Sequence, residues 1–445
     1  MKIDTRRTKD AVYIVDDLYM HETNHLVPSG YDLDARGAKC STDPCWKRGY
    51  DLETEDSLNA PATLSRRFMP IREGMAGLNF IFAIKRGDGF FVEFYDDMDK
   101  VAFTLSQKNG LFYWNDTALP VEASRKLHSL NVEFDIDKKQ AKVAFAGKYC
   151  GTYEVLTDNI ARYVAGYRGG DKGACHLKQV HLHINFLVND RNEVHEDGTL
   201  FYNWIVENTE GASAYTSYYY EGFKHYTNVI CASKGASGRC RREFEKQTGK
   251  VCFEVKYLTK NTSGEGVKLS LTTDGKETLN FFDEGTALVS EKGDVLRKHN
   301  PYVWQTFMVV ANTDTKTAEV YLNGKKCQSV TFDADFFDGI AVSYTPENGG
   351  VMKFTDVFAY IVQPEPEDYP KPPVLPEKDE RYVTGMNICS LWHNGEHVGW
   401  DAISAFKDNL TYLGFYDEGL PETADWEIKW MAEHGLDCEF YCWYS

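Results

Sequence analysis

The sequence repeats itself at an offset of 177 residues. "SLNVEFDIDKKQAKVAFAGKYCGTYEV", which begins at Ser129, aligns without a gap with "TFMVVANTDTKTAEVYLNGKKCQSVTF", which begins at Thr306. The same offset places "LKQVHLHIN" on "FTDVFAYIV", and "VEFYDD" on "LSLTTD". Because one offset holds at three separate places, we predict two copies of one domain in the first 363 residues. The small number of identities between the copies indicates deep divergence.

Each copy has the pattern of an all-β domain. In "AEVYLNGKK", Val320 and Leu322 alternate with Glu319 and Tyr321. This period of two residues is typical of a strand with one buried face. Asn323-Gly324 then predicts a tight hairpin, because both residue types tolerate a positive φ. Roughly ten such short strands in each copy predict a sandwich of two sheets.

The best-defined strands of the second copy resemble those of a known class of sandwich. "WQTFMVVANTDTKTAEVYLNGK" is similar to the late hairpin of concanavalin-like, or laminin-G-like, jelly-roll domains, and "FTDVFAYIV" to their last strand. This resemblance implies two curved sandwiches, which we place at residues 1–192 and 193–363. It also implies a sugar-binding or spacer role beside a glycosidase.

The composition changes after the second copy. "VQPEPEDYPKPPVLPEKDE" contains six prolines among many charges, which predicts a semi-rigid linker over residues 364–380. Residues 381–445 then show the pattern strand, helix, strand: "RYVTGMNICSLW", "PETADWEIKWMAEHG" and "LDCEFYCWYS". A helix followed at once by a buried strand is typical of a parallel sheet or barrel.

The helix of this segment has clear end signals. Pro421 or Glu422 is expected to open it and Gly435 to close it. We expect its packing face to contain three residues at helical spacing. They are Ala424, Ile428 and Met431.

The closing segment resembles the start of glycoside hydrolase family 99-like proteins, also known as WbsX-type proteins. The resemblance lies in "GFYDEGLPETADWEIKWMAEHGLD" and in the strand that ends "YCWYS". It implies a (β/α)8 barrel that hydrolyses α-linked, mannoside-type glycans. The matching positions are Gly414, Tyr416, Asp417, Pro421, Glu422, Ala432, Gly435, Leu436, Asp437, Trp443 and Tyr444.

A barrel of this kind needs about 250 residues, so residues 381–445 would form only its truncated start. Glycoside hydrolysis uses two carboxylates, and we assign none here because the family's catalytic carboxylates come from later strands, beyond Ser445. The fragment alone is therefore expected to be inactive. Candidate substrate-binding residues lie at the predicted rim of the barrel, where aromatic and acidic side chains gather. They are Trp392, His393, Tyr416, Asp417, Glu418, Trp443 and Tyr444.

Each of these candidates has a structural alternative. Trp443 or Tyr444 can pack in the barrel interior or against helices that follow, and Trp392 and His393 can pack within their loop. Asp417 and Glu418 can serve the helix N-terminus electrostatically. His181 and His183 share a strand face in the first copy, which invites a metal site. Their repeat partners are aromatic and bind no metal, so we expect packing and no metal site.

Composition restricts the partners and the compartment. Lys and Arg total 49 against 67 Asp and Glu, and the resulting net charge of −18 disfavours nucleic acid. The sequence contains no run of 18 apolar residues, so we predict no membrane span. The N-terminus also lacks the apolar core of a signal peptide. Eleven scattered cysteines fit a reducing cytoplasm. We expect no cofactor and a glycan or polysaccharide as partner.

Three functions remain open. The first is the N-terminal part of a family 99-like glycoside hydrolase with two accessory lectin-like sandwiches. The second is a non-catalytic tandem lectin-like protein, and the third is a glycosyltransferase of polysaccharide biosynthesis. Because the loops of the two copies differ, we expect at least one copy to bind sugar weakly or not at all.

Overall fold

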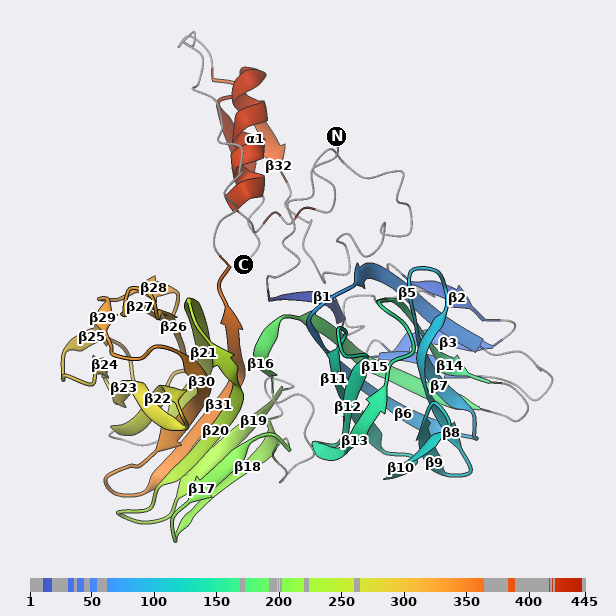
Figure 1. Ribbon diagram of the computed structural model, residues 1–445, viewed down its shortest axis with the longest axis horizontal. Coiled ribbons are helices and arrows are strands. Elements are labelled where there is room, and N and C mark those ends of the chain that lie inside the picture. The colour runs from blue at the N-terminus through green and yellow to red at the C-terminus, as the bar shows by residue number, and fades with distance from the viewer. Residues whose placement is uncertain are drawn as a thin grey trace.

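The computed structural model describes residues 11–17, 31–35, 38–43, 49–53, 62–168, 173–191, 198, 200, 202–219, 224–259, 265–363, 383–388, 416, 418 and 421–441. This part of the chain is almost entirely β-structure, which confirms the predicted fold class, and contains one helix, α1 (Pro421–Glu433). Four antiparallel sheets form two sandwiches, which lie side by side in Figure 1. In the described residues no helix has the length and apolar character needed to cross a bilayer.

The first sandwich consists of an eight-stranded and a seven-stranded sheet. The eight-stranded sheet has the order β13 (Lys148–Glu154), β12 (Gln140–Phe145), β11 (Leu127–Asp135), β6 (Met75–Arg86), β15 (Ala174–Ile184), β4 (Gly49–Glu53) and β3 (Lys39–Asp43), with β1 (Val12–Asp17) also beside β15. The seven-stranded sheet has the order β10 (Thr117–Glu122), β9 (Leu111–Trp114), β8 (Val101–Lys108), β7 (Phe90–Tyr95), β14 (Ile160–Tyr167), β5 (Ala62–Ile71) and β2 (Asp32–Asp34).

The second sandwich consists of a nine-stranded and a seven-stranded sheet. The nine-stranded sheet has the order β18 (Ala212–Tyr219), β19 (Lys224–Cys231), β31 (Gly350–Ile361), β21 (Lys250–Thr259), β26 (Gln305–Asn312), β27 (Thr317–Leu322) and β28 (Lys325–Lys326), with β16 (Phe186–Asp190) beside β31 and β29 (Val330–Thr331) beside β27. The seven-stranded sheet has the order β17 (Ile205–Asn208), β20 (Gly238–Gln247), β30 (Phe337–Tyr344), β22 (Glu265–Thr273), β23 (Lys276–Glu284), β24 (Ala287–Ser290) and β25 (Val295–Lys298).

The two sandwiches share one topology. Strand for strand, the order β13-β12-β11-β6-β15 of the first corresponds to β28-β27-β26-β21-β31 of the second. The first and last residues of β27 lie 177 positions after those of β12, and the same holds for β30 and β14. Asn323 and Gly324 have φ values of 52° and 70° in the turn after β27, as the sequence predicts.

Apolar side chains fill the space between the two sheets of each sandwich. In the first, Phe80 of β6 and Phe94 of β7 are fully buried, and the rings of Phe94 and Phe103 stack with centroids 4.7 Å apart. Each buried ring of this size contributes about 1.5–3 kcal/mol. Because strand side chains alternate between faces, the residues between them, such as Asn79, point to the outer face of the sheet. This outer face provides the functional site described below.

The second sandwich follows the first almost without a break. After Asn185, which has a φ of 60°, β16 leaves the first sandwich and pairs with β31 of the second. β16 lies between the two sandwiches in Figure 1. Ala144 on the outer face of β12 packs into the core of the second sandwich, and Tyr202 N donates to Gly147 O at 2.8 Å. The two sandwiches are therefore in direct contact.

A short parallel unit lies near the C-terminus. β32 (Gly385–Ile388) pairs in parallel with β33 (Cys438–Tyr441), and α1 lies between them in the chain. Gly435 ends α1 with a φ of 73°, and Leu436 N donates to Met431 O at 2.9 Å, as expected for this type of helix C-cap. The parallel pair fits the predicted strand–helix–strand pattern, whereas the described residues show no closed barrel.

The predicted packing face of α1 is only partly buried, because Ala424 and Met431 are half-buried and Ile428 is exposed. The buried residues are Thr423 and Trp426, whereas the side chain of Ile428 is 49% exposed. Trp426 packs against Trp430 with ring centroids 5.4 Å apart. Large aromatic rings of this kind can bury more apolar area than the aliphatic side chains of the predicted face.

Candidate functional site

Two of the seven predicted substrate-binding residues lie in the described part of the chain. Tyr416 and Glu418 come just before α1. Burial, with a contribution from the carboxylates of Glu418 and Glu427, raises the pKa of Tyr416 to about 12. Trp392, His393, Asp417, Trp443 and Tyr444 lie outside the described residues, so their predicted roles stay predictions.

Glu427 of α1 is an acidic neighbour of this pair that the sequence did not single out. Burial, with Glu418 and Glu439 nearby, raises the pKa of the Glu427 carboxyl to about 7. A carboxyl with such a pKa can take up or release a proton near neutral pH. Tyr441 donates a hydrogen bond to Glu439 at the edge of the same group. Among the described residues no group of three or more His, Cys, Asp or Glu is suited to hold a metal ion.

A cavity of about 620 Å³ lies between the two sandwiches. We call it the inter-sandwich cavity. The outer face of β6, β11 and β15 forms one wall, and β16, the segment before β17 and β20 form the other. Its polar and aromatic lining includes Tyr13, Asn79, Asn131, Glu133, Gln179, His181, His183, Asn189, Arg191, Tyr202, Asn203 and Arg242. Its size falls in the range of about 300–1,000 Å³ that is typical of small-molecule sites.

Three asparagines in this lining use only half of their hydrogen-bonding capacity. Asn79 Oδ1 accepts from Gln179 Nε2 at 2.8 Å, Asn189 Oδ1 accepts from Tyr13 OH at 2.9 Å, and Asn203 Nδ2 donates to Glu133 Oε1 at 2.9 Å. The other half of each amide, namely Asn79 Nδ2, Asn189 Nδ2 and Asn203 Oδ1, is buried without a partner among the described residues. A buried polar group without a partner costs about 1–3 kcal/mol, so three together are unusual in the lining of one cavity.

His183 adds a fourth such group. Its Nδ1 atom is buried without a partner among the described residues. Its ring packs edge-on against Tyr13 and Phe186, with centroids 5.9 Å and 5.4 Å away. Burial, reinforced by Arg191 and His181, lowers the pKa of His183 to about 3. The ring is therefore neutral at physiological pH.

Ion pairs join the two walls of the cavity. Arg191, at the end of β16, contacts Asp16 of β1 through both carboxylate oxygens, at 3.0 Å and 3.2 Å, and stacks over Tyr13. Arg242 of β20 lies 3.8 Å from Glu133 of β11. Glu133 thus faces both Asn203 and Arg242 of the second sandwich, and the cavity exists only where the two sandwiches meet.

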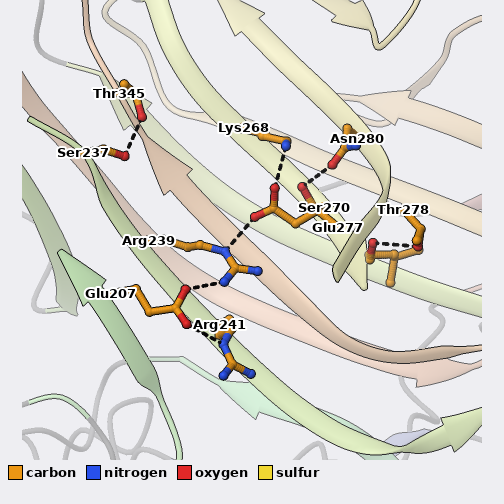
Figure 2. Close-up of polar contacts among 11 residues, drawn as sticks. Glu207, Ser237, Arg239, Arg241, Lys268, Ser270, Glu277, Thr278, Asn280 and Thr345 are labelled. Carbon is orange, nitrogen blue, oxygen red and sulfur yellow. Dashed lines mark hydrogen bonds and ion pairs between the residues drawn. The ribbon is translucent and has the colours of Figure 1, made fainter. Parts of the chain in front are cut away.

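On the outer face of the second seven-stranded sheet, charged side chains pair with one another. Glu207, Arg239, Glu277 and Lys268 form a chain of ion pairs across β17, β20, β23 and β22, which Figure 2 shows. Arg239 Nε lies 2.7 Å and Lys268 Nζ 2.5 Å from the two oxygens of Glu277. The charges of this face therefore satisfy one another.

An uncharged amide on the same face is also satisfied. Asn280 Oδ1 accepts from Ser270 Oγ at 2.8 Å, and Asn280 Nδ2 donates to Glu291 Oε1 at 3.0 Å. Both halves of this amide are used. Asn79, Asn189 and Asn203 of the inter-sandwich cavity, by contrast, each have a partner for only one half of the amide.

The inter-sandwich cavity was not predicted from the sequence. Asn79, Asn131 and Glu133 occupy the polar positions of alternating strands, and such positions ordinarily face solvent. The repeat offers one hint, because His183 corresponds to Tyr360 and Gly77 to Glu254. The two copies thus differ at positions that the first uses to line the cavity.

The chain matches no protein-family model and no curated protein. Among solved structures it is similar to a sialidase, with 8% identity and a TM-score of 0.34, over 63% of this chain and 32% of the sialidase. It is similar to the N-terminal CBM22-1-CBM22-2 tandem domain of Xyn10C from Paenibacillus barcinonensis, with 10% identity and a TM-score of 0.27, over 80% of this chain and 99% of that domain.

A third similar structure is the family 11 carbohydrate-binding module from Clostridium thermocellum in complex with a mixed-linked tetrasaccharide. It has 11% identity and a TM-score of 0.24, over 39% of this chain and 96% of the module. These neighbours are carbohydrate-active enzymes or carbohydrate-binding domains. With TM-scores below 0.5, such likenesses assign neither a ligand nor a reaction to this chain.

Proposed function

We propose that the tandem sandwiches form a carbohydrate-binding unit whose sugar site is the inter-sandwich cavity. The observation that supports this most directly is the set of half-used amides at Asn79, Asn189 and Asn203, together with the unpaired Nδ1 of His183. These groups need both donors and acceptors. Each sugar hydroxyl supplies one donor and two acceptor lone pairs, so a sugar meets this requirement.

Aromatic rings around the cavity fit the same ligand. Tyr13, Phe186, Tyr202 and Phe244 all line it. Flat rings pack against the C–H faces of sugars, while amides and carboxylates bind the hydroxyl groups. Because the unpaired atoms are shut off from solvent in this arrangement, we expect side-chain rotation or a small separation of the two walls when a sugar enters.

In the wider protein, the proposed role of this unit is accessory. We propose that residues 381–445 belong to a family 99-like glycoside hydrolase domain acting on α-linked glycans, which the parallel pair β32–β33 and the intervening α1 support. Coding sequence downstream of Ser445 tests this part. A continuing series of strand–helix repeats with paired carboxylates would support it, and a stop codon would overturn it. A non-catalytic lectin-like protein would share the same cavity and lack such a continuation.

A glycan array probed with the full chain tests sugar binding, followed by calorimetry with the best ligand. The double variant Asn79→Leu/Asn203→Leu removes two of the unpaired groups. Each lost hydrogen bond is worth about 0.5–1.5 kcal/mol, so we expect about tenfold weaker binding. The matched control is Asn280→Leu, which changes an asparagine outside the cavity. Unchanged binding in the double variant, or an equal loss in the control, would contradict the assignment of the site.

A further inference from the structure

We propose that Glu133 is a positioning residue that makes the inter-sandwich cavity require a hydrogen-bond donor from the sugar. It does so by fixing the direction of the Asn203 amide, which then offers its carbonyl oxygen to the ligand. This inference rests on the proposed function and names the class of sugar that the site takes. Such a sugar carries an unsubstituted hydroxyl group at the point where it meets Asn203.

The Asn203 amide is held on one side by a carboxylate. Asn203 Nδ2 donates to Glu133 Oε1 at 2.9 Å, and the other oxygen of Glu133 accepts from Tyr202 OH at 3.3 Å. Arg242 Nη2 lies 3.8 Å from the same Oε1 atom. An ionised carboxylate accepts hydrogen bonds and cannot donate one. If the amide turned over, Asn203 Oδ1 would face Glu133 Oε1, and two acceptors would meet without a proton between them.

The partners of the other two half-used amides are chemically different. Asn79 Oδ1 accepts from Gln179 Nε2, and Asn189 Oδ1 accepts from Tyr13 OH. A glutamine amide and a tyrosine hydroxyl can each donate and accept. Hydrogen bonds of this kind can form in either direction, so they do not by themselves decide whether the ligand meets a donor or an acceptor. A hydrogen bond to a carboxylate does decide it.

The direction of the Asn203 amide determines which ligand groups can bind to it. Asn203 lines the cavity, and its Oδ1 atom is buried without a partner among the described residues. A ligand hydroxyl group can donate to this oxygen. An acetylated, methylated or glycosidically linked oxygen has no hydrogen to donate and would leave the buried acceptor unpaired, which is unfavourable. The cavity should therefore select sugars that are unsubstituted at this position.

Fluorinated analogues of the best ligand from the glycan array test the donor requirement. In each analogue, fluorine replaces one hydroxyl group, because fluorine is similar in size and cannot donate a hydrogen bond. Calorimetry with the full chain should show at least one analogue that binds about tenfold more weakly than the parent sugar. For one such analogue the loss should disappear in Asn203→Leu, since the acceptor is gone.

The outcomes of this panel separate the inference from the proposed function. If the array yields no ligand, both fall. If a sugar binds and every analogue binds as tightly as the parent, only the inference falls. The inference also falls alone if Asn203→Leu keeps every loss that the unmodified chain shows.

The variant Glu133→Gln tests the positioning role itself. Glutamine keeps the size of the side chain and can donate as well as accept, so the Asn203 amide can turn over and present its N–H groups to the fluorine. We expect the loss for the analogue identified with Asn203→Leu to shrink from about tenfold to about threefold or less. A merely structural weakening would lower the affinities for both sugars and leave their ratio unchanged.

The matched control is Glu277→Gln, which neutralises an ion-paired carboxylate outside the cavity. This variant should keep the full loss for the same analogue. An undiminished loss in Glu133→Gln, or an equal reduction in the control, would overturn the positioning role of Glu133.

Discussion

Glu133 of the first sandwich accepts a hydrogen bond from Asn203, which precedes the first strand of the second seven-stranded sheet; Asn203 Nδ2 lies 2.9 Å from Glu133 Oε1. The same carboxylate also accepts from Tyr202 OH at 3.3 Å. One side chain of the first sandwich thus orients two of the second. The cavity between them therefore depends on the contact between the two sandwiches.

Replacing Glu133 by Ala should weaken sugar binding and lower stability together. Hydrogen bonds to a charged group are worth about 1.5–3 kcal/mol, and Asn203 would lose its orienting partner. Calorimetry and chemical denaturation of the full chain measure the two effects. Glu122→Ala, on the exposed edge strand β10, is the control. Sugar affinity that is unaltered in Glu133→Ala would show that the cavity is not the binding site.

Gly77→Ala should disturb the cavity through His183. The two residues are cross-strand neighbours on β6 and β15, and a Cβ atom on residue 77 would lie 2.3 Å from the His183 ring. Overpacking of this kind costs about 1–3 kcal/mol. The double variant Gly77→Ala/His183→Ala should recover much of that stability, because the clashing ring is gone. Thermal melts that show no recovery would mean that the strain arises elsewhere.

His183 should make the protein less stable in mild acid. The folded state lowers its pKa from an ordinary value of 6.5 to about 3, so the unfolded state binds the proton more readily between these values. Stability should therefore fall as the pH drops below about 6.5, with a slope of up to about 1.4 kcal/mol per pH unit. Denaturation at several pH values should show a shallower dependence for His183→Phe. Identical profiles would contradict a buried neutral ring.

Glu427 should make the protein less stable as the pH rises, which is the opposite of the effect of His183. Its folded-state pKa is raised from 4.5 to about 7, so the folded protein binds the extra proton and loses stability as the pH rises through this window. Glu427→Gln should be more stable than the parent at pH 8 and should lose this part of the pH dependence. Hydrogen exchange of the α1 amides reports it locally. An unchanged response between pH 4.5 and 7 would be inconsistent with the raised pKa.

Glu277→Gln should affect stability and leave sugar binding unchanged. Glu277 holds both Arg239 and Lys268 on the outer face of the second seven-stranded sheet (Figure 2), away from the cavity. Partly exposed ion pairs contribute about 0.2–1 kcal/mol each, so we expect a loss of about 1 kcal/mol that shrinks in high salt. Weaker sugar binding in this variant would relocate the site to that face.

Much of the fold follows from local sequence patterns. The repeat predicts two sandwiches of one topology, Asn323-Gly324 predicts the turn that follows β27, and Gly435 predicts the end of α1. Each of these features depends on neighbours in the chain, such as an alternating strand or a residue that tolerates positive φ. Sequence patterns record such constraints directly.

The cavity could not be predicted because it depends on how two separate units meet. Asn79 and Asn203 are far apart in the chain, and polar residues at outward strand positions ordinarily face water. The buried face of α1 was missed in part for a related reason. The aliphatic spacing of Ala424, Ile428 and Met431 is helical, but large rings such as those of Trp426 and Trp430 can bury more apolar area.

The most direct test of the central claim is a crystal structure of the full chain with its best-binding oligosaccharide. We predict a sugar residue in the inter-sandwich cavity, with hydroxyl groups within hydrogen-bonding distance of Asn79 Nδ2, Asn189 Nδ2 and Asn203 Oδ1. A sugar bound elsewhere, with the cavity filled by water alone, would contradict the account.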